Sequence, residues 1–138
     1  MFKKLIFGLS LWLFATTLSF GANFDDGVNA YEKGDYKTAL TIFEDLAKKG
    51  DIDAQYNLGL MYDNGYGVKQ DYKKAFEWYE KAATQGIAEA QNNLGVMYDD
   101  GYGVRQDKKI AKELYGKACD GGVQIACDAY KILNQQGY

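Results

Sequence analysis

Few of the side chains that perform covalent catalysis occur in this sequence of 138 residues. Histidine is absent, and the two serines, Ser10 and Ser19, lie close to the N-terminus. Beyond residue 21 the aliphatic hydroxyls belong to Thr38, Thr41 and Thr84, and none has the spacing of a known catalytic motif. A catalytic zinc would also lack histidine ligands. These residue types argue against efficient nucleophilic or zinc-dependent catalysis, and they leave open whether any reaction is catalysed.

Carboxylates are the other groups that could act on a substrate, because an acid in a shielded pocket can activate water. The candidates are Asp63, Asp99 and Asp100. Adjacent acids such as Asp99 and Asp100 are more typical of helix ends and solvated loops. We therefore assign no catalytic residue, and we expect neither a cofactor nor a metal site.

Two Gly-Tyr-Gly motifs, at residues 65–67 and 101–103, invite comparison with phosphate-binding loops. Such a loop needs further glycines or a lysine that opens the following helix. Asp71 and Asp107 stand at that place instead and would repel an anion. A phosphate or nucleotide site is therefore disfavoured.

The N-terminal segment predicts a secretory signal peptide. Two lysines precede an apolar run at residues 5–14, about half the length of roughly 20 residues that a membrane span needs. A membrane anchor is the less favoured alternative. We expect residues 1–21 to be removed, with cleavage after Gly21 or Ala22, which would leave an exported protein, periplasmic or secreted, with no membrane span.

Composition and charge fit one globular domain with a limited range of partners. The sequence is 47% hydrophobic and 25% charged, which is ordinary for a globular protein. Its net charge of −3 becomes more negative when the two lysines of the signal are removed. An acidic protein disfavours nucleic acid and anionic membranes as partners, and we expect neither.

The strongest pattern is an internal repeat of 36 residues. Residues 53–68 align with residues 89–104, and the register continues through Tyr79 and Tyr115. A fixed period of this length indicates a solenoid, in which each unit buries its apolar face on its neighbour.

Each repeat predicts two antiparallel helices. The apolar side of the first, helix A, is formed by Ala54, Leu58, Met61 and Tyr62. Gly59 lies beside this stripe and predicts close approach of an aromatic ring, which we expect to be Tyr79. In the second, helix B, Asp71 is a good N-cap and Gly86 follows the last turn.

With this repeat the chain resembles the Sel1-like repeat family, which is related to tetratricopeptide repeats. The resemblance rests on Ala54, Leu58, Gly59, Tyr62, Gly65, Gly67, Val68, Asp71, Ala75, Trp78, Tyr79, Lys81, Ala82, Ala83 and Gly86 and on their counterparts 36 residues later. Leu114, Ile110 and Cys119 depart from the tryptophan, lysine and alanine of the preceding repeat. The resemblance implies that helix A lines the concave side of the solenoid and that proteins or peptides bind there.

The expected fold is an all-α, right-handed superhelical solenoid of antiparallel helix pairs, in a single domain at residues 22–138. Residues 24–50 form a degenerate first unit with a shorter turn, and residues 51–86 and 87–122 form two Sel1-like repeats. Residues 123–138 are expected to be a C-terminal capping helix with a solvated outer face.

Cys119 and Cys127 are the two cysteines of the chain. They fall in the last turn of one helix B and the first turn of the next helix A. An exported setting is oxidising, so a structural disulfide is favoured over a redox pair or metal site, which the spacing and the absence of histidine disfavour. The pairing is similar to that of secreted cysteine-rich Sel1-like proteins of the Helicobacter type, some of which bind penicillin-type compounds and are catalogued as β-lactamases.

The favoured hypothesis is a scaffold that binds a protein, a peptide or a cell-envelope ligand on helix A. Candidate ligand-binding residues, carried over from the tetratricopeptide groove, are Tyr56, Leu60, Asp63, Asn92, Asn93, Val96, Asp99 and Asp128. Solvated helix faces would show the same polar pattern. The alternative that the resemblance implies is a penicillin-binding protein with slow β-lactamase activity, although neither serine nor histidine occurs beyond residue 21 to support it.

Overall fold

The computed structural model describes residues 21–138, and this part of the chain is entirely α-helical outside its turns. The described helices are α1 (Phe24–Glu32), α2 (Tyr36–Lys48), α3 (Ile52–Asn64), α4 (Tyr72–Thr84), α5 (Ala88–Asp100), α6 (Lys108–Asp120) and α7 (Gln124–Gln135). The predicted all-α repeat fold is confirmed. The predicted signal peptide lies outside the described residues, apart from Gly21. None of the helices from residue 21 onward has the length and hydrophobicity that crossing a bilayer needs.

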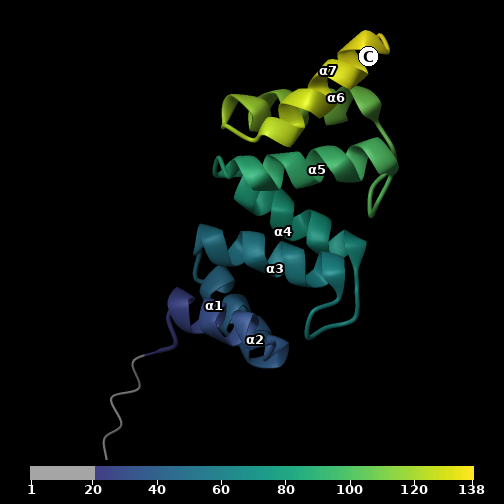
Figure 1. The fold of residues 1–138 in the computed structure, drawn as a ribbon. Helices are drawn as coiled ribbons and strands as arrows, with labels where there is room; N and C mark the ends of the chain where they lie inside the picture. The colour runs from purple at the N-terminus through teal and green to yellow at the C-terminus, as the bar shows by residue number, and fades with distance from the viewer. Residues whose placement is uncertain (1–20) are drawn as a thin grey trace, which may run out of the picture.

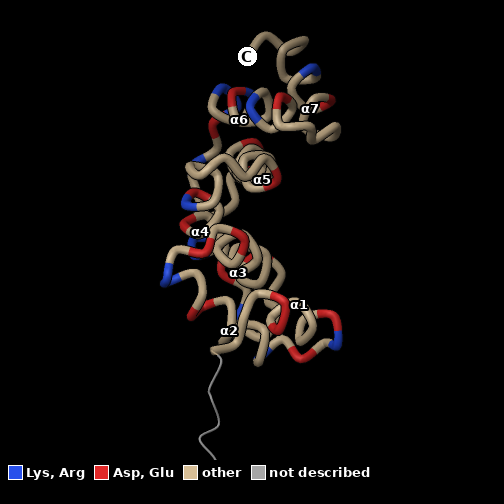
Figure 2. The backbone as a smooth tube through the Cα atoms, turned by 90° about the vertical axis from the view of Figure 1, so that its left-hand side faces the viewer, with Lys and Arg blue, Asp and Glu red and all other residues tan. Residues whose placement is uncertain are grey.

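Each helix packs against its neighbours along the chain, so the molecule is a stack of helix pairs (Figure 1). The odd-numbered helices are the predicted A helices, and the even-numbered ones are the B helices. Figure 2 shows the two sets on opposite sides of a bent stack, with the A helices on the inner side of the bend. We call the side formed by α3, α5 and α7 the A face.

Glycines in the A helices let aromatic rings of the B helices approach the backbone. A Cβ atom on Gly59 would lie 2.5 Å from a ring carbon of Tyr79, and one on Gly95 would lie 2.7 Å from the ring of Tyr115. Such distances leave no room for a side chain. The predicted contact between Gly59 and Tyr79 is confirmed, and it recurs one repeat later.

The degenerate first unit has the same contact between a helix-A glycine and a helix-B ring, but the ring is a phenylalanine. A Cβ atom on Gly27 of α1 would lie 2.6 Å from the ring of Phe43, which is fully buried. Helix α1 begins at a capping box in which Asn23 and Asp26 exchange hydrogen bonds between side chain and backbone. The first unit therefore packs like the two repeats that follow it.

Aspartates cap the B helices as the sequence predicts. The carboxylate of Asp71 accepts a hydrogen bond from the backbone N–H of Lys74 at 3.1 Å, and Asp107 accepts from the N–H groups of Lys109 and Ile110. These bonds satisfy amides that have no partner inside the helix. The start of each B helix is thus fixed, and so is the position of its first residue.

The loop after each complete A helix lies on the first turn of the preceding B helix, and we call each such place a junction. At junction one, the ring of Tyr66 stacks on Tyr36 with centroids 4.7 Å apart. At junction two, Tyr102 stacks on Tyr72 at 5.0 Å. Gly67 makes the close approach possible, because its φ is +69° and a Cβ atom there would lie 2.6 Å from the Tyr36 carbonyl oxygen.

The outer face of α7 is less polar than the prediction of a solvated cap requires. Lys131 is exposed as expected, but Ile125 and Ile132 are also 69% and 54% exposed. Tyr130 packs its ring on Gly116 of α6, at 3.4 Å from where a Cβ atom would lie, and stays 38% exposed. The capping role of residues 123–138 remains a prediction.

Candidate functional site

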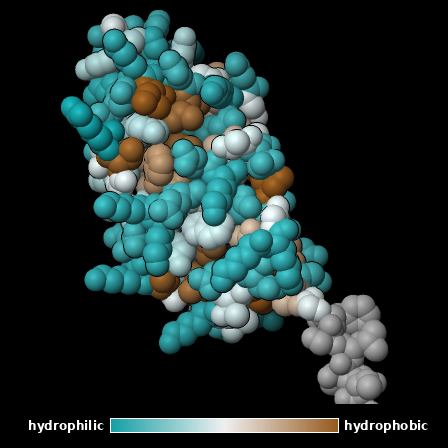
Figure 3. Space-filling model, turned by 180° about the vertical axis from the view of Figure 1, so that it is seen from behind, coloured by the Kyte–Doolittle hydropathy of each residue, from teal (hydrophilic) through white to brown (hydrophobic). Residues whose placement is uncertain are grey.

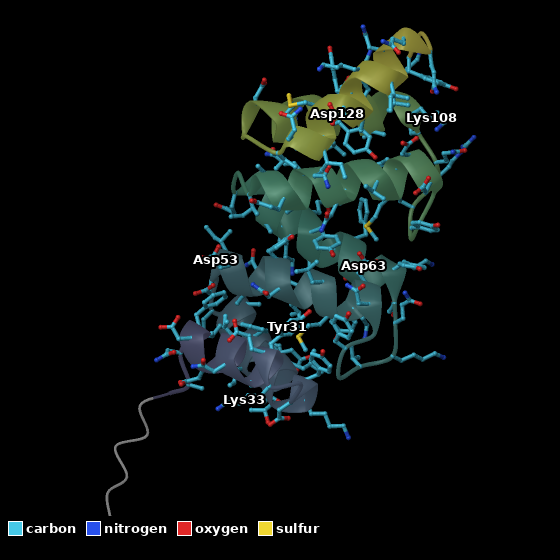
Figure 4. The ribbon with its side chains drawn as sticks, viewed as in Figure 1. Tyr31, Lys33, Asp53, Asp63, Lys108 and Asp128 are labelled. Carbon is cyan, nitrogen blue, oxygen red and sulfur yellow. A yellow bond between two sulfur atoms is a disulfide. The ribbon has the colours of Figure 1, made fainter. Side chains whose placement is uncertain are left out.

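The predicted ligand-binding residues all lie on the A helices. Tyr56, Leu60 and Asp63 are on α3, Asn92, Asn93, Val96 and Asp99 are on α5, and Asp128 is on α7. Figure 4 labels Asp63 near the C-terminal end of α3 and Asp128 on α7. Because α5 lies between α3 and α7 in the stack (Figure 1), these side chains are distributed along one face and do not form a single cluster.

A pocket of about 200 Å³ brings three of them together. We call it the junction-two pocket, and its lining residues are Asp63, Tyr72, Asn93, Val96, Met97 and Tyr102. It combines one carboxylate and one amide with aromatic and aliphatic walls. The other predicted residues, Asp128 among them, lie outside this pocket.

Three of the lining residues, Tyr72, Met97 and Tyr102, are not among the site residues that the sequence predicts. Tyr72 opens helix α4, and Tyr102 comes from the loop after α5, so their contact joins one repeat to the next. The signal that could have revealed them is the repeat itself, since Tyr36 and Tyr66 form the same stack 36 residues earlier. One face of the Tyr102 ring is covered by Tyr72, and the residue is 45% exposed, so the rest of the ring is accessible to a ligand.

Asp63 is held in place by hydrogen bonds. The Tyr79 hydroxyl donates to Oδ2 of Asp63 at 3.0 Å, and Nε2 of Gln70 donates to the Asp63 carbonyl oxygen at 2.6 Å. Burial, and then the negative charge of Asp63, raise the pKa of Tyr79 far above its ordinary value, so this hydroxyl stays a donor. Among the described residues no lysine or arginine pairs with Asp63.

Asn93 forms the polar wall of the pocket. Its Oδ1 accepts a hydrogen bond from Nδ2 of Asn92 at 3.4 Å. The rings of Tyr56 and Tyr79 lie nearby, with centroids 5.9 Å apart. Burial, followed by the charge of Glu89, raises the pKa of Tyr56, and the Asn93 amide offsets part of that rise. The polar groups next to the pocket are therefore neutral hydroxyls and amides, with Asp63 as the charged group on its wall.

At junction three, Tyr138 after α7 meets Lys108 at the start of α6. This junction is built differently, because position 108 is lysine where position 72 is tyrosine. Nζ of Lys108 pairs with the carboxylate of Asp99, which also accepts a hydrogen bond from the Tyr115 hydroxyl at 3.5 Å. The hydrogen bond to Asp99 raises the pKa of Lys108. The same ammonium group lies over the ring of Tyr138, 5.9 Å from its centroid.

Comparison with known proteins assigns the repeats to a family. The Sel1 repeat model matches residues 52–87 and 88–123, which together make up half of the chain. The chain belongs to the Sel1 repeat family. A search of curated proteins finds no match.

Solved structures of Sel1 repeat proteins share this fold. A Sel1 repeat protein from Oxalobacter formigenes is 33% identical with a TM-score of 0.79, over 83% of this chain and 47% of that one. A protective antigen of uropathogenic Escherichia coli with an SLR fold is 30% identical with a TM-score of 0.65, over 86% of this chain and 34% of that one. This chain therefore spans about half of the first relative and a third of the second.

A third structure, cysteine rich protein B of Helicobacter pylori, supports the fold alone. It is 22% identical with a TM-score of 0.62, over 78% of this chain and 97% of that one.

The two cysteines of the present chain lie close enough to pair. Cys119 and Cys127 are in disulfide geometry between α6 and α7, with their Cα atoms 4.7 Å apart. The predicted pairing therefore fits the repeat geometry.

Two of the three threonines that the sequence left as nucleophile candidates, Thr41 and Thr84, use their hydroxyls in hydrogen bonds within their own helices. The hydroxyl of Thr41 donates a hydrogen bond to the Lys37 carbonyl oxygen at 3.0 Å, and that of Thr84 donates to the Glu80 carbonyl oxygen at 2.7 Å. Both bonds are local contacts within one turn. Neither side chain lines the junction-two pocket.

Proposed function

We propose that this Sel1 repeat protein is a scaffold that binds an extended segment of a partner protein along its A face. The observation that carries the proposal is an apolar row with a pocket beside it. Leu60, Val96 and Ile132 follow one another at the repeat spacing on α3, α5 and α7, and Val96 and Ile132 are 37% and 54% exposed. An exposed apolar row on a solenoid is typical of an interaction surface.

Polar side chains flank this row in the same register. Tyr56, Asn92 and Asp128 occupy equivalent positions four residues before the apolar ones. Hydroxyl, amide and carboxylate groups at regular spacing can hydrogen-bond the backbone of an extended chain, while the apolar row takes up its side chains. The side-chain amide of Asn92 already donates a hydrogen bond to Oδ1 of Asn93, which limits the freedom of both side chains before a ligand binds.

The size of the pocket favours a peptide side chain over a drug-sized ligand. Small-molecule sites typically enclose about 300 to 1,000 Å³, whereas the junction-two pocket has about 200 Å³. The binding or slow hydrolysis of β-lactams has less support, because only family resemblance suggests it. Turnover of nitrocefin by purified, disulfide-intact protein would reverse this preference, provided that it survives removal of contaminating enzyme.

Export of the protein is part of the same proposal. It is supported by the signal-like segment at residues 1–21 and by the paired geometry of Cys119 and Cys127, since structural disulfides persist in oxidising compartments. The partner would then be a periplasmic or extracellular protein. Fractionation of cells that make the full chain, followed by mass determination of the N-terminus, tests this part.

The A face has a matched control on the opposite side of the stack. Figure 3 shows that side as largely hydrophilic, with apolar side chains gathered toward the C-terminal end. Ile110 of α6 is 38% exposed, almost the same as Val96 at 37%. Ile110 lines a B-helix groove together with Phe76 and Leu114. We therefore expect the same polar substitution at either position to affect folding to a similar extent.

The experiment uses peptides selected for binding to the protein from a random library. We expect Val96→Asn to weaken the affinity for them at least roughly tenfold, because it removes methyl groups from the apolar row and buries an unpaired amide under the ligand. Ile110→Asn should leave the affinity unchanged. Equal loss in both variants, or loss only in Ile110→Asn, would refute binding on the A face.

A further inference from the structure

Junction three shows how this fold accommodates a cation. The ammonium group of Lys108 pairs with Asp99 and lies over the ring of Tyr138. A carboxylate and a ring face together supply a charge-assisted hydrogen bond and a cation–π contact. The side chain of Lys108 is 31% exposed, so the cation is partly withdrawn from water.

Junction two has the equivalent carboxylate and ring, and the ring of Tyr72 stacks on Tyr102 where the ammonium group of Lys108 lies over Tyr138. Asp63 and Tyr102 stand 36 residues before Asp99 and Tyr138. Figure 4 shows Asp63 and Lys108 along the same edge of the stack. Tyr72 occupies the place of the lysine and cannot neutralise Asp63, and no other cation does so within residues 21–138. Oδ2 of Asp63 accepts a hydrogen bond from the Tyr79 hydroxyl, while no described residue donates a hydrogen bond to Oδ1 of Asp63.

Junction one has no carboxylate at this place. Asp63 and Asp99 each follow the helix-A glycine by four residues, and in α1 that position is Tyr31. The ring of Tyr31 packs edge-on against Tyr36 and Tyr66, with centroids 5.2 and 5.8 Å away. Of the three junctions in the described part of the chain, only junction two therefore offers an external cation a carboxylate without a paired cation, next to a partly exposed ring.

We propose that the junction-two pocket binds a basic side chain, lysine or arginine, of the partner protein. The inference rests on the proposed function, since it identifies the chemistry of the segment that binds the A face. The ammonium or guanidinium group contacts the free oxygen of Asp63 and the part of the Tyr102 ring that Tyr72 leaves exposed, and its aliphatic stem lies on Val96 and Met97. The pocket volume of about 200 Å³ suits one long side chain, the apolar walls suit its aliphatic stem, and the carboxylate suits its positive charge. The acidic protein, with a net charge of −3, also favours a basic partner.

The test is an NMR titration of the disulfide-intact protein with Nα-acetyl-lysine methylamide. Nα-acetyl-norleucine methylamide, which has nearly the same stem and no charge, is the matched probe. We expect saturable shifts in backbone amides of residues 63, 96, 97 and 102 with the lysine probe. The norleucine probe should bind at least roughly tenfold more weakly, the difference expected for one charge-assisted hydrogen bond with a cation–π contact.

Three variants locate the effect. Asp63→Asn keeps an oxygen that accepts the hydrogen bond from Tyr79, and it should lower the affinity for the lysine probe by a similar factor. Tyr72→Lys reproduces junction three, so its own ammonium should fill the site and abolish binding. Asp53→Asn removes an exposed carboxylate from the other end of α3 (Figure 4) and should change nothing. Circular dichroism of each variant establishes that it is folded.

The outcomes separate this inference from the proposed function. Equal binding of both probes, or full binding by folded Asp63→Asn, overturns the cation site. Library peptides that bind the A face without a basic residue, and tolerate Asp63→Asn, leave the scaffold function standing and overturn the inference. A lysine probe that binds at Asp63, in a protein for which no A-face peptide is found, supports the cation site and counts against the scaffold function.

Discussion

The ring of Tyr79 lies directly against the backbone of Gly59, at a place where a Cβ atom would be 2.5 Å from a ring carbon. This contact joins the two helices of a repeat. Its counterparts are the contacts of Gly27 with Phe43 and of Gly95 with Tyr115. Helix pairing in this protein therefore depends on the absence of a side chain at a single position in each unit.

We predict that Gly59→Ala destabilises the fold. The added methyl group must displace a fully buried ring, at a cost of about 1 to 3 kcal/mol, and the better helix propensity of alanine returns at most about 1 kcal/mol. Gly116→Ala is the control, because a Cβ atom there meets Tyr130 at an ordinary 3.4 Å. Urea unfolding should show a lower free energy of unfolding for Gly59→Ala and no loss for Gly116→Ala.

The loop glycines give a second prediction. Gly67→Ala should destabilise by about 2 kcal/mol or more, since it combines a left-handed backbone with a clash against the Tyr36 carbonyl. Gly86 also has a positive φ, of +94°, but open space around it. Gly86→Ala should therefore cost only about 1 kcal/mol. If thermal unfolding showed equal losses of stability for Gly67→Ala and Gly86→Ala, the loop would not dock on α2.

Reduction of the disulfide should lower the stability of the C-terminal helix pair. Cys119 and Cys127 are eight positions apart, and closing a loop of that length contributes about 2 to 3 kcal/mol by restricting the unfolded chain. Urea unfolding of the oxidised protein and of the Cys119→Ala/Cys127→Ala variant measures the difference. Identical midpoints and slopes for the two proteins would contradict the structural role.

Alkaline pH should destabilise the protein through Tyr79. Burial and Asp63 raise the pKa of Tyr79 in the folded state above the ordinary value of 10.0. Above pH 10 the unfolded chain therefore loses a proton that the folded chain keeps, so the free energy of unfolding falls by up to about 1.4 kcal/mol per pH unit. Below that pH the contribution is fully present.

Tyr79→Phe tests this pH dependence, and Phe43 at the equivalent place in α2 shows that the fold accepts the ring without its hydroxyl. The variant should lose about 1 kcal/mol at pH 7 with the hydrogen bond to Asp63. Its stability should then decline less steeply than that of the wild type between pH 10 and 11.5. Parallel curves for the two proteins in denaturant titrations would contradict the assignment.

The sequence predicts the contacts that repeat within one unit. Gly59 and Tyr79 could be paired because their spacing recurs at Gly95 and Tyr115, and Asp71 could be assigned as a cap from its own chemistry. These contacts depend on local helix geometry, which the 36-residue period displays directly.

The junctions could not be predicted in the same way. The stack of Tyr72 on Tyr102 depends on how the loop of one unit lies over the helix of the unit before it, which is a tertiary relationship. The ion pair of Lys108 with Asp99 has the same origin. The exposed Ile125 likewise reflects the packing of α7, since nothing in the described part of the chain covers that position.

Binding on the A face is tested most directly by a chemical-shift map of the protein bound to a peptide selected from the random library. We predict that the perturbed amides follow α3, α5 and α7 through Leu60, Val96 and Ile132, and include the junction-two pocket. Perturbations concentrated instead on α4 and α6, around Ile110 and Leu114, would contradict it.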